Sequence, residues 1–222
     1  SLGLLATGFE KGDRLAIIGD SAPEWYFSEI AAQALRGIAV AIHPGLTTDE
    51  LSYFIEDAQP RFIVVDGQEQ VDKVLELDSL IKGVKGVVYW NYKGLSRYNN
   101  PFLKGLKELY RAGEEYERER GVIFDEIVKE GMLDDPCLII YTSGTEKKRP
   151  KGVIHTFSSL IENAIHLLEA DPWYREDNHV PQLPPFWIFD QILGFGCHLL
   201  SGCTLNFPES PETVRRDTTE IE

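Results

Sequence analysis

Apolar residues in this chain alternate between two spacings, and the alternation predicts an order of strands and helices. Short runs of consecutive apolar residues have the length of β-strands that are buried on both faces. These runs cover residues 15–18, 38–42, 62–65, 84–89 and 137–140. Between them, apolar residues recur at helical spacing, with turn residues at the joins. Repeated strand–helix–strand units build parallel sheets, so we predict a doubly wound α/β fold with mostly parallel sheet layers and flanking helices.

Capping residues indicate where the helices begin. Ser21 followed by Pro23 predicts a helix whose cap is the serine hydroxyl. Thr47 and Glu50 have the spacing of a capping box, in which side chain and backbone satisfy each other at the first turn. A further helix is expected at about residues 68–77.

Residues 91–135 are less regular and divide the chain. Their charged part, residues 103–120, mixes acidic and basic side chains at the spacing of a solvated helix surface. We therefore expect a first α/β subdomain with this connector over residues 1–133 and the start of a second over residues 134–222. In the second, helices are predicted at about 160–169, capped by Ser158 or Ser159, and at 192–200, before a strand at 204–207.

Composition narrows the class of protein. The 222 residues are 43% hydrophobic, which is enough for a substantial core, and carry a formal charge of −14, which opposes general binding to nucleic acid. No apolar run approaches the roughly 20 residues that cross a bilayer, and no basic-then-apolar leader begins the chain. We expect a cytoplasmic protein without a transmembrane segment. Peripheral contact with a membrane and the oligomeric state stay open.

Three cysteines, Cys137, Cys197 and Cys203, form no close-spaced pair. Their odd number suggests reduced thiols in a cytosol. With His198, two of them could be imagined as metal ligands, but a fourth partner and the usual spacing are missing. We therefore expect no metal site and interpret the cysteines as core residues.

The segment with the most chemical potential is residues 141–152, which reads Tyr-Thr-Ser-Gly-Thr-Glu-Lys-Lys-Arg-Pro-Lys-Gly between two apolar runs. Its hydrogen-bonding and cationic side chains are Thr142, Ser143, Thr145, Lys147, Lys148, Arg149 and Lys151. Gly144 allows a tight turn, and the composition is that of a loop that binds phosphate. A solvated hairpin tip would have a similar composition, so both interpretations stay open at this point.

A second candidate segment is residues 182–190, Gln-Leu-Pro-Pro-Phe-Trp-Ile-Phe-Asp. Two consecutive prolines hold the backbone extended and place Phe186, Trp187 and Phe189 at a strand-to-helix junction. Such a group of aromatic side chains could form the wall of an apolar ligand site, or it could be ordinary core packing.

Together, these segments resemble those of the adenylate-forming (AMP-binding) enzymes, most closely the bacterial long-chain fatty acyl-CoA synthetases. The resemblance spans nearly the whole chain. The segments that carry it are residues 11–14 with 23–25, residues 44–47, residues 135–152, residues 183–190 and residues 206–214. Several motifs in the family's order make the resemblance specific.

The resemblance implies an acid–thiol ligase of the AMP-forming type. In that reaction a carboxylate attacks the α-phosphorus of ATP to give acyl-AMP and pyrophosphate, and coenzyme A then displaces AMP to form a thioester. It implies ATP, Mg²⁺, coenzyme A and a fatty acid as the small molecules bound. The residues implied at the β- and γ-phosphates are Thr142, Ser143, Gly144, Thr145 and Lys151, with Gly152 allowing close backbone approach. Phe186 and Trp187 are implied at the acyl and adenylate pocket.

This chain departs from the family pattern in its phosphate loop. The family usually has a second Thr-Gly pair where charged residues stand here, and the loop is one position longer. The missing glycine could alter the grip on a triphosphate, while the added lysines could compensate through charge. Phe157 occupies a position where many members carry histidine, and Phe186 one where a small alanine is usual.

The family's remaining motifs, including its catalytic lysine, are expected beyond Glu222. We therefore expect the catalytic residues to be absent and the chain to be an amino-terminal portion that is inactive by itself. Two alternatives stay open: an acyl-AMP ligase or a synthetase for aryl or short-chain acids, and a degenerate homologue that binds nucleotide or acyl chains without turnover.

Overall fold

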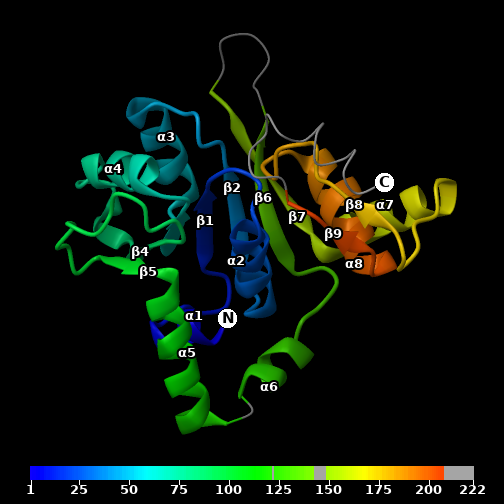
Figure 1. The fold of residues 1–222 in the computed structure, drawn as a ribbon, viewed down its shortest axis with the longest axis horizontal. Helices are drawn as coiled ribbons and strands as arrows, with labels where there is room; N and C mark the ends of the chain where they lie inside the picture. The colour runs from blue at the N-terminus through cyan, green and yellow to red at the C-terminus, as the bar shows by residue number, and fades with distance from the viewer. Residues whose placement is uncertain (122, 143–148, 208–222) are drawn as a thin grey trace.

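The computed structural model describes residues 1–121, 123–142 and 149–207, and these form one main β-sheet with helices on both faces (Figure 1). The strands of this sheet are β1 (Arg14–Ile18), β2 (Ile38–Ile42), β3 (Phe62–Val65), β4 (Gly86–Tyr89), β5 (Leu103–Gly105), β6 (Pro136–Thr142) and β7 (Lys151–Thr156). They lie in the order β5-β4-β3-β1-β2-β6-β7. All neighbours are parallel except β6 and β7, which form an antiparallel hairpin.

The helices of the described residues follow the predicted alternation. They are α1 (Leu2–Ala6), α2 (Pro23–Ala34), α3 (Thr48–Ala58), α4 (Gln68–Glu76), η1 (Ile81–Gly83), α5 (Leu106–Arg120), α6 (Ile123–Lys129), α7 (Phe157–Ala170), the π-helix η2 (Asp190–Gly196) and α8 (Cys197–Ser201). A small separate sheet pairs β8 (Asn178–His179) with β9 (Thr204–Leu205). The predicted doubly wound α/β fold is confirmed.

Alternate strand residues build two cores, one on each face of the sheet. Leu15 points into the core that α1, α2 and α5 cover, with Trp25 of α2 at its centre. Ala16, the next residue, belongs to the core beneath α3 and α4, where Leu51 and Val74 are buried. Side chains alternate along a strand, so a central strand with helices on both sides is apolar at every position.

The predicted helix starts are correct at one of three positions. Thr47 caps α3 in a complete capping box with Glu50. The prediction for Ser21 is wrong, because α2 begins after Ala22 and no side chain caps it. Pro23 lacks an N–H group and already fixes the backbone of the first turn. The prediction for α7 is also wrong, since Thr156 is its cap and Ser159 supplies the reciprocal side chain.

The predicted subdomain boundary at residues 133/134 falls between α6 and β6. Strands β6 and β7 complete the same sheet as β1–β5. Helices α7, η2 and α8 then pack together beside that end of the sheet (Figure 1). The division into 1–133 and 134–222 stays a prediction.

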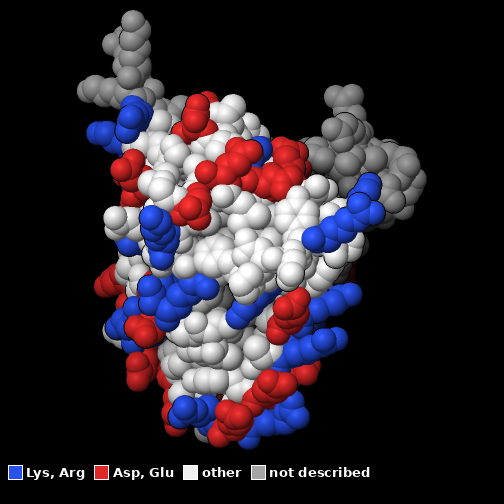
Figure 2. Space-filling model, turned by 90° about the vertical axis from the view of Figure 1, so that its left-hand side faces the viewer, with Lys and Arg blue, Asp and Glu red and all other residues white. Residues whose placement is uncertain are grey.

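The surface on the side of α3, α4 and β5 carries charges of both signs. Figure 2 shows acidic and basic side chains interspersed on this face around areas without charge. Among the residues that the structure describes, no helix combines the length and apolar character needed to cross a membrane.

Candidate phosphate-binding edge of the sheet

The β6–β7 hairpin presents part of the predicted phosphate loop at the carboxyl edge of the sheet. Thr142 pairs with Lys151, and Tyr141 pairs with Gly152, at the end of the hairpin ladder. The side chains of Thr142 and Lys151 are exposed there. Ser143, Gly144 and Thr145, like Lys147 and Lys148, lie outside the described residues. The pairing of Thr142 with Lys151 thus places one hydroxyl and one ammonium group on neighbouring strands at this edge.

Gly152 is required by close packing within the hairpin. A Cβ atom at this position would lie 3.0 Å from Cγ2 of Ile139 and 3.4 Å from the ring of Tyr141. The Tyr141 ring is partly buried, and this burial, followed by its hydrogen bond to Asp57, raises the pKa of the phenol. A larger residue at 152 would therefore press mainly on Ile139, which would have to shift by a few tenths of an ångström.

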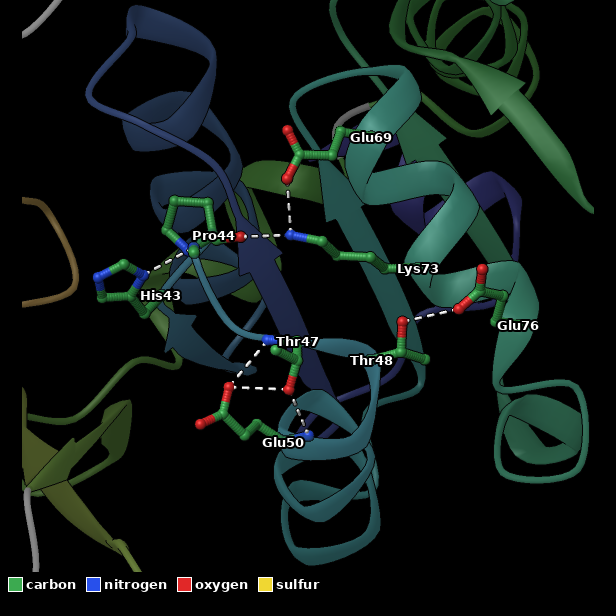
Figure 3. A network of polar contacts seen from close by, with 9 residues as sticks. His43, Pro44, Thr47, Thr48, Glu50, Glu69, Lys73 and Glu76 are labelled. Atoms are coloured by element: carbon green, nitrogen blue, oxygen red, sulfur yellow. Dashed lines mark hydrogen bonds and ion pairs between the residues drawn. The ribbon is translucent and has the colours of Figure 1, made fainter.

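The loop that follows β2 forms the neighbouring part of the same edge. Strand β2 pairs with β6, Ala41 lying beside Ile140, so the ends of both strands are adjacent. Within the loop, the backbone N–H of Gly45 donates to Nδ1 of His43 at 2.7 Å. This holds the imidazole against its own backbone, as Figure 3 shows.

Contacts from α4 hold this loop in place (Figure 3). Lys73 donates to the carbonyl oxygen of Pro44 at 2.9 Å and to Glu69 at 2.7 Å. Thr48, in the first turn of α3, donates to Glu76 at 2.7 Å. The loop and the start of α3 are thereby fixed to α4, the neighbouring helix on the same face of the sheet.

The predicted aromatic segment reaches the same edge through one residue. The ring of Phe186 lies 4.5 Å from the ring of His43, centroid to centroid. Phe186 is half-buried, whereas Trp187 and Phe189 are 53% and 52% exposed. The structure therefore brings Phe186 to the loop after β2 and leaves the other two aromatic side chains largely in solvent. Sequence reasoning did not identify His43, although its place directly after a buried strand was a usable signal.

A cavity of about 180 Å³ opens between α2, α7 and η2, and its lining does not include the predicted pocket residues. Phe157 of α7 and Phe195 of η2 are among its apolar lining residues, and Glu29 and Gln191 are among its polar ones. Phe186 and Trp187 lie outside this lining, so their assignment to an acyl pocket stays a prediction.

Buried polar side chains tie the helix after the aromatic segment to α2. Tyr26 donates to Asp190 at 2.8 Å, and burial raises the pKa of the Asp190 carboxyl to about 6. Glu29 is fully buried and accepts from Gln33 at 2.9 Å; burial raises the pKa of its carboxyl to about 8. Gln191 donates to the carbonyl oxygen of Pro185 at 2.7 Å.

Two buried oxygen atoms of this group, Oε2 of Glu29 and Oε1 of Gln191, lack a hydrogen-bond partner in the described part of the chain. Sequence reasoning missed this cluster. A signal existed, because Glu29 lies four residues after Trp25 and three before Ala32, which are both buried, and so shares their face of the helix.

The cysteines occupy the core as predicted. All three are buried free thiols, and burial raises the pKa of Cys137 to about 12. Cys203 and His198 approach to 3.8 Å between Sγ and Nδ1. Within residues 1–121, 123–142 and 149–207, no group of three potential ligands is arranged to hold a metal ion.

Comparison with known proteins points to one family. A family model described as "AMP-binding enzyme" matches residues 1–221. The long-chain-fatty-acid–CoA ligase ACSBG1 of Rattus norvegicus is 30% identical over 152 residues, which are 68% of this chain and 20% of that protein. The mitochondrial medium-chain acyl-CoA ligase ACSF2 of Danio rerio is 25% identical and is matched over 99% of this chain and 38% of its own length.

A solved structure shows the same fold. The ATP-bound MatB of Rhodopseudomonas palustris superimposes with a TM-score of 0.73 at 21% identity, over 98% of this chain and 40% of that one. This chain thus spans about a fifth of the length of the first of these relatives and about two fifths of the other two.

Proposed function

Because the chain belongs to the AMP-binding enzyme family, we propose that it is part of an ATP-dependent fatty acid–CoA ligase and that it supplies the grip on the nucleotide's phosphates. The reaction joins a carboxylate to the α-phosphorus of ATP and releases pyrophosphate. The thiol of coenzyme A then attacks the acyl carbon and releases AMP. A long-chain acid is the substrate class favoured by the name of the ACSBG1 relative.

The observation that carries this proposal is the placement of Thr142 and Lys151. They form the end pair of the hairpin ladder, exposed at the carboxyl edge of a mostly parallel sheet. Ligands in open α/β sheets bind outside the carboxyl ends of the strands. A hydroxyl and an ammonium group there can bind the phosphate oxygens of ATP, together with the proposed residues Ser143, Gly144 and Thr145. Such contacts orient and neutralise the departing pyrophosphate.

Mg²⁺ is proposed to arrive with the nucleotide. Thr142 and Lys151 offer a hydroxyl and an ammonium group, which suit phosphate oxygens, and neither is a carboxylate of the kind that usually binds Mg²⁺ in proteins. When bound to the triphosphate, Mg²⁺ supplies further neutralisation of negative charge. The residues of this chain then hold the phosphate oxygens that the cation leaves free.

The test of the phosphate assignment is a calorimetric titration of ATP·Mg²⁺ into the chain and a Lys151→Ala variant. A charge-assisted hydrogen bond contributes about 1.5–3 kcal/mol, so Kd should rise roughly 10- to 100-fold in the variant. Lys82→Ala is the matched control, since Lys82 is exposed and lies between α4 and β4. Equal affinity for the unchanged chain and Lys151→Ala would remove the assignment.

A second candidate function is nucleotide or acyl binding without turnover. It is favoured by the charged residues that stand in place of the family's second Thr-Gly pair in the loop. Exchange of labelled pyrophosphate into ATP by the whole protein separates the two candidates. Binding of ATP without exchange would support the second.

A further inference from the structure

Helix α3 contacts the β6–β7 hairpin, here called the phosphate hairpin, through two hydrogen bonds one helical turn apart. Both reach the loop end of its ladder, at Tyr141 and Pro150, which is called the hairpin base because the loop begins there. The hydroxyl of Tyr53 donates to the carbonyl oxygen of Pro150 at 2.6 Å. The hydroxyl of Tyr141 donates to Oδ2 of Asp57 at 2.7 Å. One bond reaches the incoming end of β7 and the other the outgoing end of β6, so both arms of the hairpin are attached to the same helix.

Aromatic contacts reinforce these bonds. The rings of Phe54 and Tyr141 meet edge to face, 4.5 Å between centroids, and Phe54 is almost fully buried. The guanidinium group of Arg149 lies over the Tyr53 ring, 5.1 Å from its centre. Such contacts add to hydrogen bonds that would be weak in solvent. They also direct the Arg149 cation toward α3.

The helix that provides these contacts is itself fixed at its first turn. The capping box of Thr47 and Glu50 closes its N-terminus, and the Thr48–Glu76 bond joins it to α4 (Figure 3). Lys73 holds the preceding Pro44 carbonyl. The hairpin base therefore rests on an element that is attached to the sheet, to α4 and to its own cap.

We propose that Tyr53 and Asp57 are positioning residues for phosphate binding, which hold the hairpin base so that Thr142 and Lys151 are set before the nucleotide arrives. The inference rests on the proposed function of the hairpin. The bonds end at Pro150 and Tyr141, each adjacent in sequence to one of the two phosphate-binding residues. Ordering the binding groups in advance lowers the entropy lost on binding.

Hydrogen exchange tests the anchoring without any ligand. Tyr53→Phe removes the donor hydroxyl of the first bond and keeps the ring, and Asp57→Ala removes the acceptor of the second bond. Loss of one hydrogen bond should speed amide exchange in β6 and β7 roughly threefold to tenfold, while β1 and β3 stay unchanged. Asp57→Asn retains an acceptor and should restore most of the protection. Unchanged exchange in both Tyr53→Phe and Asp57→Ala would overturn the inference.

The matched control is Tyr98→Phe. Tyr98 also donates to a carboxylate, Asp72 of α4, but it lies far from the hairpin in the connection after β4. Its loss should leave exchange in β6 and β7 unchanged. Faster exchange there in Tyr98→Phe would show a general effect of losing a tyrosine hydroxyl and would count against a specific anchor.

Titration of ATP·Mg²⁺ then tests the link to binding. Tyr53→Phe and Asp57→Ala should raise Kd roughly threefold to tenfold, and Tyr98→Phe should not. If Lys151→Ala weakens binding and the α3 variants do not, the positioning role fails and the phosphate assignment stands. If the unchanged chain and Lys151→Ala bind equally, the proposed function fails, and the positioning role fails with it.

Discussion

At the scale of the residue, Glu29 is an acidic side chain in a buried environment that normally holds apolar residues. The carboxyl is fully buried between α2 and η2, and its Oε1 accepts from Gln33. Burial disfavours the charged form, which is why the pKa rises to about 8, with the nearby Asp190 adding in the same direction. The residue therefore holds a proton at neutral pH in the folded chain and loses it in the unfolded chain.

This difference predicts a pH dependence of stability. Between the ordinary glutamate pKa and about 8, the folded state binds more protons than the unfolded state, so the free energy of unfolding should fall as pH rises. The slope from this group approaches about 1.4 kcal/mol per pH unit. Urea unfolding at pH 6 and pH 8 measures it, and Glu29→Gln should flatten the slope. Asp190 acts in the same direction between its ordinary pKa and about pH 6, so most of the change between pH 6 and pH 8 comes from Glu29.

Glu56→Gln is the control for Glu29→Gln, since Glu56 is exposed on α3. It should keep the slope of the unchanged chain. A slope that is the same in Glu29→Gln would show that other groups cause the dependence and that Glu29 is ionised in the folded state.

At the scale of the element, α3 connects the loop after β2 to the phosphate hairpin. Its beginning is specified locally by Thr47 and Glu50, and its later turns carry Tyr53 and Asp57 toward the hairpin. A helix end leaves backbone N–H groups without partners, and the cap satisfies them. The starting point of α3 thus depends on a short sequence signal, while its buried residues Leu51, Phe54 and Ile55 pack it against the sheet.

We predict that Thr47→Ala lowers the free energy of unfolding by about 1 kcal/mol, because it removes the side-chain acceptor of the capping box. Thr47→Ser should recover most of the loss. Ser21→Ala is the contrasting variant, since the serine does not cap α2 and its substitution should cost less than about 0.5 kcal/mol. Chemical denaturation measures the free energy of unfolding of the three variants and so tests this assignment. A larger loss for Ser21→Ala than for Thr47→Ala would refute this assignment of the caps.

At the scale of the whole molecule, the pairing of β2 with β6 joins parts of the chain that are far apart in sequence. Arg36, next to the start of β2, bonds to Asp135, next to the start of β6, at 3.1 Å. Its other contact, to Glu130 at 3.0 Å, reaches a side chain that is 71% exposed. The Arg36 bond and a backbone N–H donor at Met132 hold the pKa of Asp135 below its usual range.

The two ion pairs of Arg36 should contribute differently to the free energy of unfolding. Arg36→Gln should lower the free energy of unfolding by about 1–3 kcal/mol, mainly through loss of the bond to Asp135, whose side chain is largely buried. Glu130→Gln should cost less than about 0.5 kcal/mol, because its carboxylate is solvated. Urea unfolding of both variants measures this. Equal losses would show that the Glu130 contact matters as much as the one at the strand junction.

Much of the fold was predictable, because its signals are local. The apolar runs predicted the central strands, and the residues between them predicted helices, since the two periodicities differ. The hairpin and the cap at Thr47 followed from neighbouring residues. The predicted cap of α7 was wrong because Thr156, Ser158 and Ser159 stand close together, and only the backbone path decides which one faces the open N–H groups. The predicted cap of α2 was wrong because this helix begins after Ala22 with Pro23 in its first turn and has no side-chain cap.

The candidate site was predictable only in part. Thr142, Lys151 and Gly152 were recognised from composition and order; the structure places them at the carboxyl edge of the sheet, and their phosphate-binding role stays a prediction. His43 against Phe186, Glu29 beneath η2, and Tyr53 and Asp57 at the hairpin were not foreseen. Each of these contacts joins residues from different elements.

By itself, the sequence determined the α/β alternation, the apolar runs on either side of residues 141–152 and the family to which the chain belongs. The tertiary structure alone decided that β6 lies beside β2, that the loop after β2 borders the hairpin, and that α3 holds the hairpin base. The physical reason is that periodicity and capping act between residues a few positions apart. Strand order and side-chain contacts between elements depend on how distant segments pack, and no local pattern records that.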